Sequence, residues 1–312
     1  MVNRVDRREF LKRAGIVVAG SMLAGGELAG ASEGHEPSDS TLGVLVDTTL
    51  CIGCRKCELA CERKNSLTRK PDKFFEDTSV LNRKRPLSIE SYTIVNKYRY
   101  QNAPKPTFIK TQCMHCNYPA CVSACIVGAL TKDKKTGAVL YDYDKCIGCR
   151  YCMVACPHQV PKYEFSEPLK PRVMKCNFCG DLLARGGTPA CVDACPVSCL
   201  VFGKRNTLVK LGHKWIDKNP RRYANHIYGE HEVGGSSWMY LAGGSFETLG
   251  LSPVGDKAPP ELSEKLQHSV FKHWIPPVSL YLILGGAMWL FKRKDEAAAS
   301  DGGDQHSGEN KD

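Results

Sequence analysis

Short apolar runs, each followed by a loop rich in cysteine, recur through the middle of the chain. Each run predicts a short β-strand that leads into the loop and then into a short helix. The runs are residues 44–46, 108–110 and 139–141. Further strands are predicted at residues 200–202, after the last cysteine group, and at residues 238–241, between two Gly-Gly pairs. The polar residues 131–137 predict the turn of a hairpin.

The first 31 residues are typical of an export signal. Arg7 and Arg8 precede a mildly apolar stretch at residues 14–26, and small residues follow up to Ala31. This order predicts a twin-arginine signal peptide over residues 1–31. The alternative is a short basic amphipathic helix. The twin-arginine pathway moves folded proteins, so the thiols could take up metal in the reducing cytoplasm before export.

Residues 274–291 carry no charge and are followed by Lys292, Arg293 and Lys294. Eighteen residues at 1.5 Å each extend about 27 Å, close to the bilayer core of about 30 Å. We therefore predict a single transmembrane helix at 274–291, with a buried core helix as the alternative. The basic residues predict a disordered cytoplasmic tail at 292–312, which places the body on the periplasmic side of the cytoplasmic membrane. Residues 213–273 are expected to be an exported extension that packs on the cysteine-rich domain or on a partner.

The chain has 17 cysteines, and all but one fall into four groups of four. The groups are Cys51, Cys54, Cys57 and Cys61; Cys113, Cys116, Cys121 and Cys125; Cys146, Cys149, Cys152 and Cys156; and Cys176, Cys179, Cys191 and Cys195. The third group, followed by Pro157, has the spacing of the bacterial ferredoxin run that binds 4Fe–4S clusters. Two-residue gaps let a tight loop place three sulfurs on one cluster, and the last step carries the fourth sulfur to a neighbouring cluster.

Zinc and disulfides are the competing explanations for the cysteines. Zinc sites usually join two cysteine pairs that lie about a dozen residues apart, whereas the first and third groups each hold four cysteines within eleven residues. Zinc would fit best at the long gap between Cys179 and Cys191. Disulfides are disfavoured because Cys-x2-Cys neighbours in a tight loop are poorly placed to bridge. The spacing therefore predicts four 4Fe–4S clusters as the cofactors.

Sharing of the fourth cysteine requires the groups to work in pairs. Groups two and three are adjacent and form one two-cluster module, so groups one and four must close the other module around it. The predicted fold class is α+β, with two intertwined bacterial-type two-cluster ferredoxin modules in a domain at residues 42–212, plus the C-terminal transmembrane helix. The clusters would staple a domain that has little apolar core of its own.

The formal charge of +10 would ordinarily suggest nucleic acid or an acidic membrane surface as a partner. Four oxidised clusters with their thiolates add about −8, however, and the signal peptide removes five basic and three acidic residues. The mature protein is thus expected to be near neutral, without a nucleic-acid partner. No paired carboxylates, nucleophile or organic cofactor pocket stands out, so we expect a non-catalytic electron-transfer subunit.

Nearly the whole chain resembles the four-cluster ferredoxin-type electron-transfer subunits of respiratory membrane complexes, most closely the iron–sulfur subunit of hydrogenase-2-type uptake nickel–iron hydrogenases. The resemblance rests on the two terminal segments, on the fourth cysteine group and on residues 110–125, 144–165 and 226–241. It implies four ligand sets. The first is Cys51, Cys54, Cys57 and Cys195; the second is Cys61, Cys176, Cys179 and Cys191; the third is Cys113, Cys116, Cys121 and Cys156; and the fourth is Cys125, Cys146, Cys149 and Cys152. Glu62 and Ile126 stand where the family pattern has proline.

The resemblance also implies partners. Electrons would enter from the small and large subunits of a nickel–iron hydrogenase and leave toward quinone through a multi-span membrane subunit, as part of anaerobic respiration. One alternative is the electron-transfer subunit of a molybdopterin oxidoreductase, such as a formate dehydrogenase or a sulfur-compound reductase. Another is a zinc-stabilised scaffold at the membrane.

Several residues near the cysteine groups have more than one interpretation. Cys199 is expected to be a small buried residue at the start of a strand and not a ligand. His115 and His158 are expected to be solvated loop histidines, although hydrogen bonds to cluster sulfur are the alternative. Four basic residues beside ligands either offset cluster charge or are ordinary surface charges: Arg55, Lys56, Arg150 and Lys175.

Overall fold

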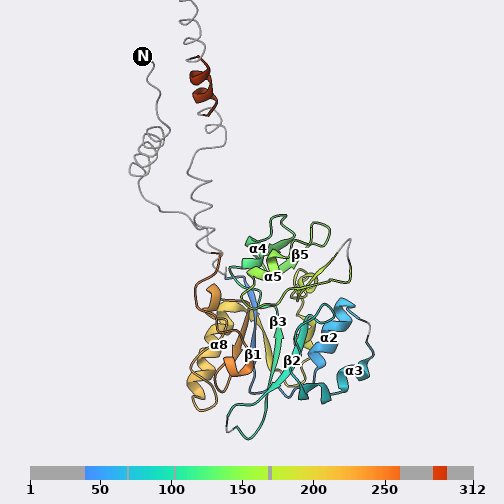
Figure 1. Ribbon diagram of the computed structural model, residues 1–312. Helices are drawn as coiled ribbons and strands as arrows, with labels where there is room; N and C mark the ends of the chain where they lie inside the picture. Colours follow the sequence, from blue (N-terminus) through green and yellow to red (C-terminus); the bar gives the residue numbers. More distant parts are fainter. Residues whose placement is uncertain (1–38, 69, 102, 168–170, 261–283, 294–312) are drawn as a thin grey trace, which may run out of the picture. The chain divides into compact units, whose positions relative to one another are not determined.

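The computed structural model describes residues 39–68, 70–101, 103–167, 171–260 and 284–293 (Figure 1). Contacts divide the chain into two units, one of residues 35–264 and one made of the two ends. Residues 284–293 belong to the second unit and are helical. The predicted signal peptide and most of the predicted membrane helix and tail lie outside the described residues. Within the described residues, no helix is both long and apolar enough to cross a bilayer.

A three-stranded sheet forms the centre of the larger unit. Strand β1 (Leu42–Asp47) lies between β8 (Leu200–Lys204), which is antiparallel to it, and β9 (Trp238–Leu241), which is parallel. Val44 faces Phe202 on one side and Trp238 on the other. Both faces of β1 are covered, as is usual for a strand in parallel pairing. The strands predicted at 44–46, 200–202 and 238–241 are confirmed.

Three two-stranded hairpins surround this sheet. Strand β2 (Thr93–Tyr98) pairs with β3 (Thr107–Gln112), β4 (Leu130–Lys132) with β5 (Val139–Tyr141), and β6 (Lys162–Tyr163) with β7 (Val173–Met174), all antiparallel. The strands predicted at 108–110 and 139–141 are confirmed. The predicted turn begins two residues later than expected, because residues 131 and 132 belong to β4, and it is closed by a hydrogen bond from the Gly137 N–H to the Asp133 carbonyl, at 2.8 Å.

Most helices are short and follow the cysteine loops. In the described part of the larger unit the α-helices are α2 (Lys56–Asn65), α3 (Asp72–Glu76), α4 (Ala120–Ser123), α5 (Tyr151–Ala155), α6 (Gly180–Leu183), α7 (Ala190–Asp193) and α8 (Arg205–Lys218), and 3-10 turns lie at Ser79–Asn82, Glu232–Gly234 and Glu247–Leu249. Helix α5 ends just before Cys156 and Pro157, whereas α2 continues to Asn65 because Glu62 follows Cys61. The missing proline therefore lengthens this helix.

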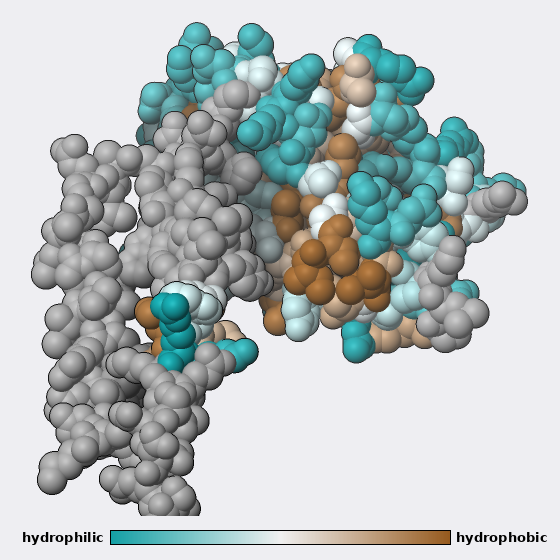
Figure 2. Space-filling view, turned by 90° about the horizontal axis from the view of Figure 1, so that it is seen from above, coloured by the Kyte–Doolittle hydropathy of each residue, from teal (hydrophilic) through white to brown (hydrophobic). Residues whose placement is uncertain are grey.

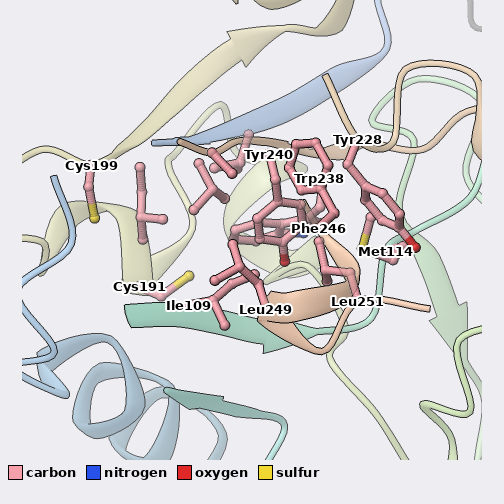
Figure 3. Packing of buried hydrophobic residues seen from close by; sticks show 14 of the residues in the cluster. Ile109, Met114, Cys191, Cys199, Tyr228, Trp238, Tyr240, Phe246, Leu249 and Leu251 are labelled. Carbon is pink, nitrogen blue, oxygen red and sulfur yellow. The ribbon is translucent and has the colours of Figure 1, made fainter. Parts of the chain in front are cut away.

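Several residues between 213 and 260 are part of the central packing. All four residues of β9 are buried, and Trp238 and Tyr240 lie in the main apolar cluster together with Ile109 (Figure 3). On the other face of the sheet, α8 packs through Leu208 and Ile216. The predicted boundary at residue 212 falls inside α8. The described part of the extension supplies β9, which pairs with β1, the strand directly before the first cysteine group.

Candidate iron–sulfur centres

The first and third cysteine groups have the same loop geometry. Gly53 and Gly148 have φ of +72° and +71°, and Arg55 and Arg150, which precede α2 and α5, have φ of +60° and +65°. Left-handed residues of this kind turn successive backbone N–H groups toward one concave side, where an anion can bind. A β-carbon at Gly53 would lie 2.5 Å from the Phe108 ring. These loops are therefore shaped to enclose an anionic group.

The four thiols of the first set line one cavity. Cys51, Cys54, Cys57 and Cys195 share it with Cys199 and Lys110, and apolar side chains complete its walls. The lining fits a cluster, because it places the four thiols of the set, Cys199 and the basic residues Arg55 and Lys110 around one space that apolar residues close. The sulfurs of Cys195 and Cys199 are 3.4 Å apart.

The thiols of the second set are also neighbours. Burial raises the pKa of Cys61 well above its usual value, and the nearby Cys176, Cys191 and Cys179 raise it further, while Lys110 opposes them. Cys61 comes from the first group and the other three from the fourth group. The structure thus brings together cysteines more than a hundred residues apart in the sequence.

The third set is equally close. Burial raises the pKa of Cys116, and Cys113, Cys156 and Cys121 raise it further. Cys113 and Cys156 also belong to one packed cluster, which agrees with a common site for this set. Three of these cysteines come from the second group and one from the third.

The fourth set has the same pattern in reverse. Burial, Cys146, Cys149 and Cys125 together raise the pKa of Cys152 to about 11. Here the third group supplies three thiols and the second group supplies one. The exchange of one cysteine between adjacent groups is what the ferredoxin run requires.

The chemistry of these donors fits 4Fe–4S clusters. All 17 cysteines are free thiols, and each is buried or half-buried. Burial disfavours the thiolate, so a cationic iron centre is needed to ionise these ligands. Among the residues that the structure describes, no three Cys, His, Asp or Glu side chains form a group that could hold a single metal ion. A cubane differs from a single ion in taking one thiolate on each of four irons.

The four sets adjoin one another in a single order. Their packing supports this order, because one apolar cluster includes Cys57 and Cys191, a second includes Cys113 and Cys176, and a third includes Cys121 and Cys152. The ring of His115, which lies between Cys113 and Cys116 in the sequence, stacks on that of Phe178, which lies between Cys176 and Cys179, with centroids 4.9 Å apart. The first set therefore meets the second, the second meets the third, and the third meets the fourth.

The interpretation of the two histidines as solvated is wrong. His115 is fully buried, and its Nδ1 accepts a hydrogen bond from the Val139 N–H at 2.8 Å. Burial lowers the pKa of His115 well below its usual value, and Lys175 adds to the effect. Burial also lowers the pKa of His158 to about 4, and its Nε2 is shielded from solvent. Both rings are held in packed surroundings that the polar loop sequence did not indicate.

The basic residues near the ligands divide into two kinds. Arg55 and Lys175 are buried, whereas Lys56 and Arg150 are exposed. Cys199 is buried directly before β8, as predicted, and a hydrogen bond from its thiol lowers the pKa of Cys51 to about 7. Its contact with two proposed ligands was not predicted.

Lys110 is the main residue near the clusters that sequence reasoning missed. It lies on β3, three residues before Cys113, and is 2 % exposed. The alternation of Phe108, Lys110 and Gln112 on one face of a strand was the available signal, because that face turns inward.

Comparison with known proteins agrees with this geometry. Residues 105–205 match the family model described as 4Fe-4S dicluster domain. A protein of Nitratidesulfovibrio vulgaris (strain Hildenborough) is 42 % identical over 95 % of this chain and 80 % of its own length. The hydrogenase-2 operon protein HybA of Escherichia coli O157:H7 is 35 % identical over 97 % of this chain and 99 % of its own. The iron–sulfur subunit of the nitrate-inducible formate dehydrogenase of Escherichia coli K12 is 31 % identical over 63 % of this chain and 66 % of its own.

Fold, thiols and relatives define an iron–sulfur protein of the ferredoxin type. Proteins of this class transfer electrons through 4Fe–4S clusters as subunits of respiratory oxidoreductase complexes. Within the class, this chain belongs to the HybA family, since the likeness to HybA extends over nearly the full length of both chains.

Proposed function

We propose that sixteen thiols hold four 4Fe–4S clusters, which carry electrons from the catalytic subunits of a nickel–iron hydrogenase to a quinone-reducing membrane subunit. The observation that supports this most directly is the order of the four thiol sets, in which members of successive sets share a packed cluster. A chain of adjoining redox centres is what a relay needs, and a group of isolated structural metals would not require it. The ligands are the sixteen cysteines of the first to fourth sets.

The protein's own contribution is to hold and shield the clusters. Each cluster would supply one-electron chemistry when bound. The cysteines are buried or half-buried, which limits the access of water, and the ring of His115, next to Cys116 of the third set, stacks on that of Phe178, next to Cys179 of the second set. We assign no catalytic residue to this chain, so the hydrogenase subunits would do the chemistry.

One end of the relay carries an exposed apolar surface. Around the fourth set, Ile126, Ile147 and Val154 are 68 %, 61 % and 88 % exposed. The face that carries α4 and α5 shows an apolar patch when viewed from above (Figure 2). Clusters of exposed apolar side chains mark protein contacts on soluble surfaces. This supports a docking role for the end of the relay that holds the fourth set.

We also propose export and membrane anchoring. The twin arginines would direct the folded, iron-loaded chain across the membrane, and residues 274–291 would hold it on the periplasmic side. Replacing Arg7 and Arg8 by lysine should leave the iron-loaded chain in the cytoplasm. Cell fractionation measures the location of the variant. Its recovery on the periplasmic side would contradict this part of the proposal.

Metal analysis and spectroscopy test the relay. An anaerobically purified full chain should contain about sixteen irons, and stepwise reduction should show several interacting spin-½ centres by low-temperature EPR. A few zinc ions without iron would instead support the scaffold alternative. The relatives named as formate dehydrogenase iron–sulfur subunits keep a molybdopterin partner as the second candidate. Affinity purification of the tagged chain from native membranes, with mass spectrometry, separates the two: recovery of a molybdopterin subunit without hydrogenase would reject the hydrogenase assignment.

A further inference from the structure

Lys110 is a buried cation in the middle of the first module. It is 2 % exposed on β3, and it lines the cavity enclosed by the first thiol set. Burying an ammonium group without compensation costs several kcal/mol. Its surroundings must therefore supply negative charge or strong acceptors.

The ammonium group is held in one place by neighbours that favour a cation. Its Nζ donates a hydrogen bond to Gln112 Oε1 at 2.9 Å and lies 4.3 Å from the centroid of the Trp238 ring. Gln112 Nε2 in turn donates to the Tyr240 hydroxyl at 2.6 Å, and that hydroxyl donates to the backbone carbonyl of Lys110 at 2.9 Å. This closed network joins β3 to β9 and fixes the position of the charge.

Thiolates of two sets, once ionised by bound clusters, would supply the compensating charge. Although burial lowers the pKa of Lys110, the neighbouring Cys191, Cys57 and Cys176 raise it, and the net change is upward. Cys57 belongs to the first set, and the other two belong to the second. Among the described residues, no carboxylate forms an ion pair with Lys110. Lys110 lines the cavity of the first set, and the Trp238 ring next to it lies 5.8 Å from the ring of Phe178, between Cys176 and Cys179 of the second set. The ammonium group therefore lies beside both cluster sites.

The other buried cations nearby are already neutralised or saturated. Lys132 Nζ donates to the carbonyls of His115, Cys116 and Gly137, at 3.1, 2.9 and 2.6 Å. Arg55 forms an ion pair with Glu58 at 2.9 Å. Lys175 Nζ likewise donates to the carbonyls of Val139 and Cys176, at 2.5 and 3.0 Å. Lys110 differs from all three because, within the part of the chain that the structure describes, no backbone carbonyl or carboxylate accepts from its ammonium group.

We propose that Lys110 is a positioning residue for electron transfer: a fixed counter-cation shared by the clusters of the first and second sets, which raises their reduction potentials. Reduction by one electron makes each cluster more negative by one charge, so a fixed nearby cation stabilises the reduced state more than the oxidised state. The effect is large where water is excluded, as it is here. The inference rests on the proposed ligation by these two sets.

Removing the charge should change two clusters out of four. The test variant is Lys110→Met, which preserves most of the side-chain length, and Lys110→Arg retains the charge. The control is Lys56→Met, because Lys56 is adjacent to the ligand Cys57 but exposed, where water screens its charge. Each full-length chain is purified anaerobically with its clusters, its iron is counted, and all four clusters are titrated under EPR.

The expected result is a lower reduction potential for two clusters in Lys110→Met, with at least a tenfold smaller equilibrium constant for reduction. That factor corresponds to about 59 mV for one electron. Lys110→Arg and Lys56→Met should stay close to wild type. Unchanged potentials in Lys110→Met, or an equal shift in Lys56→Met, would reject the role of Lys110.

Loss of clusters from a variant would also decide whether Lys110 acts through its charge. If Lys110→Met loses iron while Lys110→Arg retains it, the counter-charge is needed even for assembly, and the proposal is supported. If both lose iron equally, the side chain acts through packing and the proposal is wrong. A wild-type chain with far fewer than about sixteen irons would instead refute the proposed ligation itself.

Discussion

Glu58 should be one of the most costly polar residues to replace in this protein. It lies on α2 between the proposed ligands Cys57 and Cys61, and its carboxylate is 4 % exposed. It accepts hydrogen bonds from the Arg55 Nη2 at 2.9 Å, from the Arg85 Nη2 at 2.5 Å and from the Val95 N–H at 2.6 Å. The carboxylate thus joins the helix that carries two ligands to the β2–β3 hairpin.

The size of the effect follows from what Glu58→Gln leaves behind. The new amide would direct N–H groups at the donors of Arg55, whose side chain is fully buried, and the two arginines would lose their shared counter-charge. Breaking a buried ion pair from one side costs about 3–5 kcal/mol. Since about 1.4 kcal/mol is a factor of ten, local opening at α2 should become roughly a hundredfold to several thousandfold more frequent.

Iron release to a ferrous chelator under anaerobic conditions measures this opening. The release rate should rise by that factor in Glu58→Gln, provided that opening and closing are fast relative to capture of iron. The control is Glu90→Gln, which removes an exposed ion pair with Lys70 and should cost less than about 1 kcal/mol. If Glu58→Gln released iron within about threefold of this control, the account of the buried network would be wrong.

Three further predictions address a ligand, a surface and the core. Cys199→Ala should retain about sixteen irons, whereas Cys195→Ala should lose iron from one cluster, as iron analysis of purified chains would show. Val154→Lys and Ile126→Glu should reduce co-purification with the partner complex and leave the EPR spectrum unchanged, because they alter an exposed apolar surface and no ligand. Trp238→Ala should destabilise the protein by about 3–5 kcal/mol in anaerobic denaturant unfolding, since the ring is fully buried.

The cysteine spacing and the apolar runs were enough to predict much of the fold. The runs at 44–46, 108–110, 139–141 and 200–202 are strands, since a buried strand beside a loop leaves a local pattern of apolar residues. The pairing of the cysteine groups could also be predicted from the sequence, because a run of the ferredoxin type cannot complete its cluster alone. Both signals are local or follow from ligand number.

The burial of polar residues could not be predicted from the sequence in the same way. His115 and Lys110 lie in polar stretches, and only contacts with distant residues bury them. The His115 ring is covered by Phe178, and Lys110 by Trp238, each more than sixty residues later in the chain. Parallel pairing of β9 with β1 likewise depends on a long connection that no turn motif marks. The interpretation of His115 as a solvated residue failed for this reason.

The same topology restricts when the first module can assemble. Strand β1 needs β8 on one side and β9 on the other, so the sheet before the first cysteine group is incomplete until residue 241 has been synthesised. The first set needs Cys195 for the same reason, whereas groups two and three adjoin in the sequence and can close first. Contacts this distant in sequence form slowly because the loop-closure entropy is lost before they contribute. A module that closes late needs a reducing compartment that keeps its thiols metal-competent throughout, which agrees with the predicted export of a chain that has already folded.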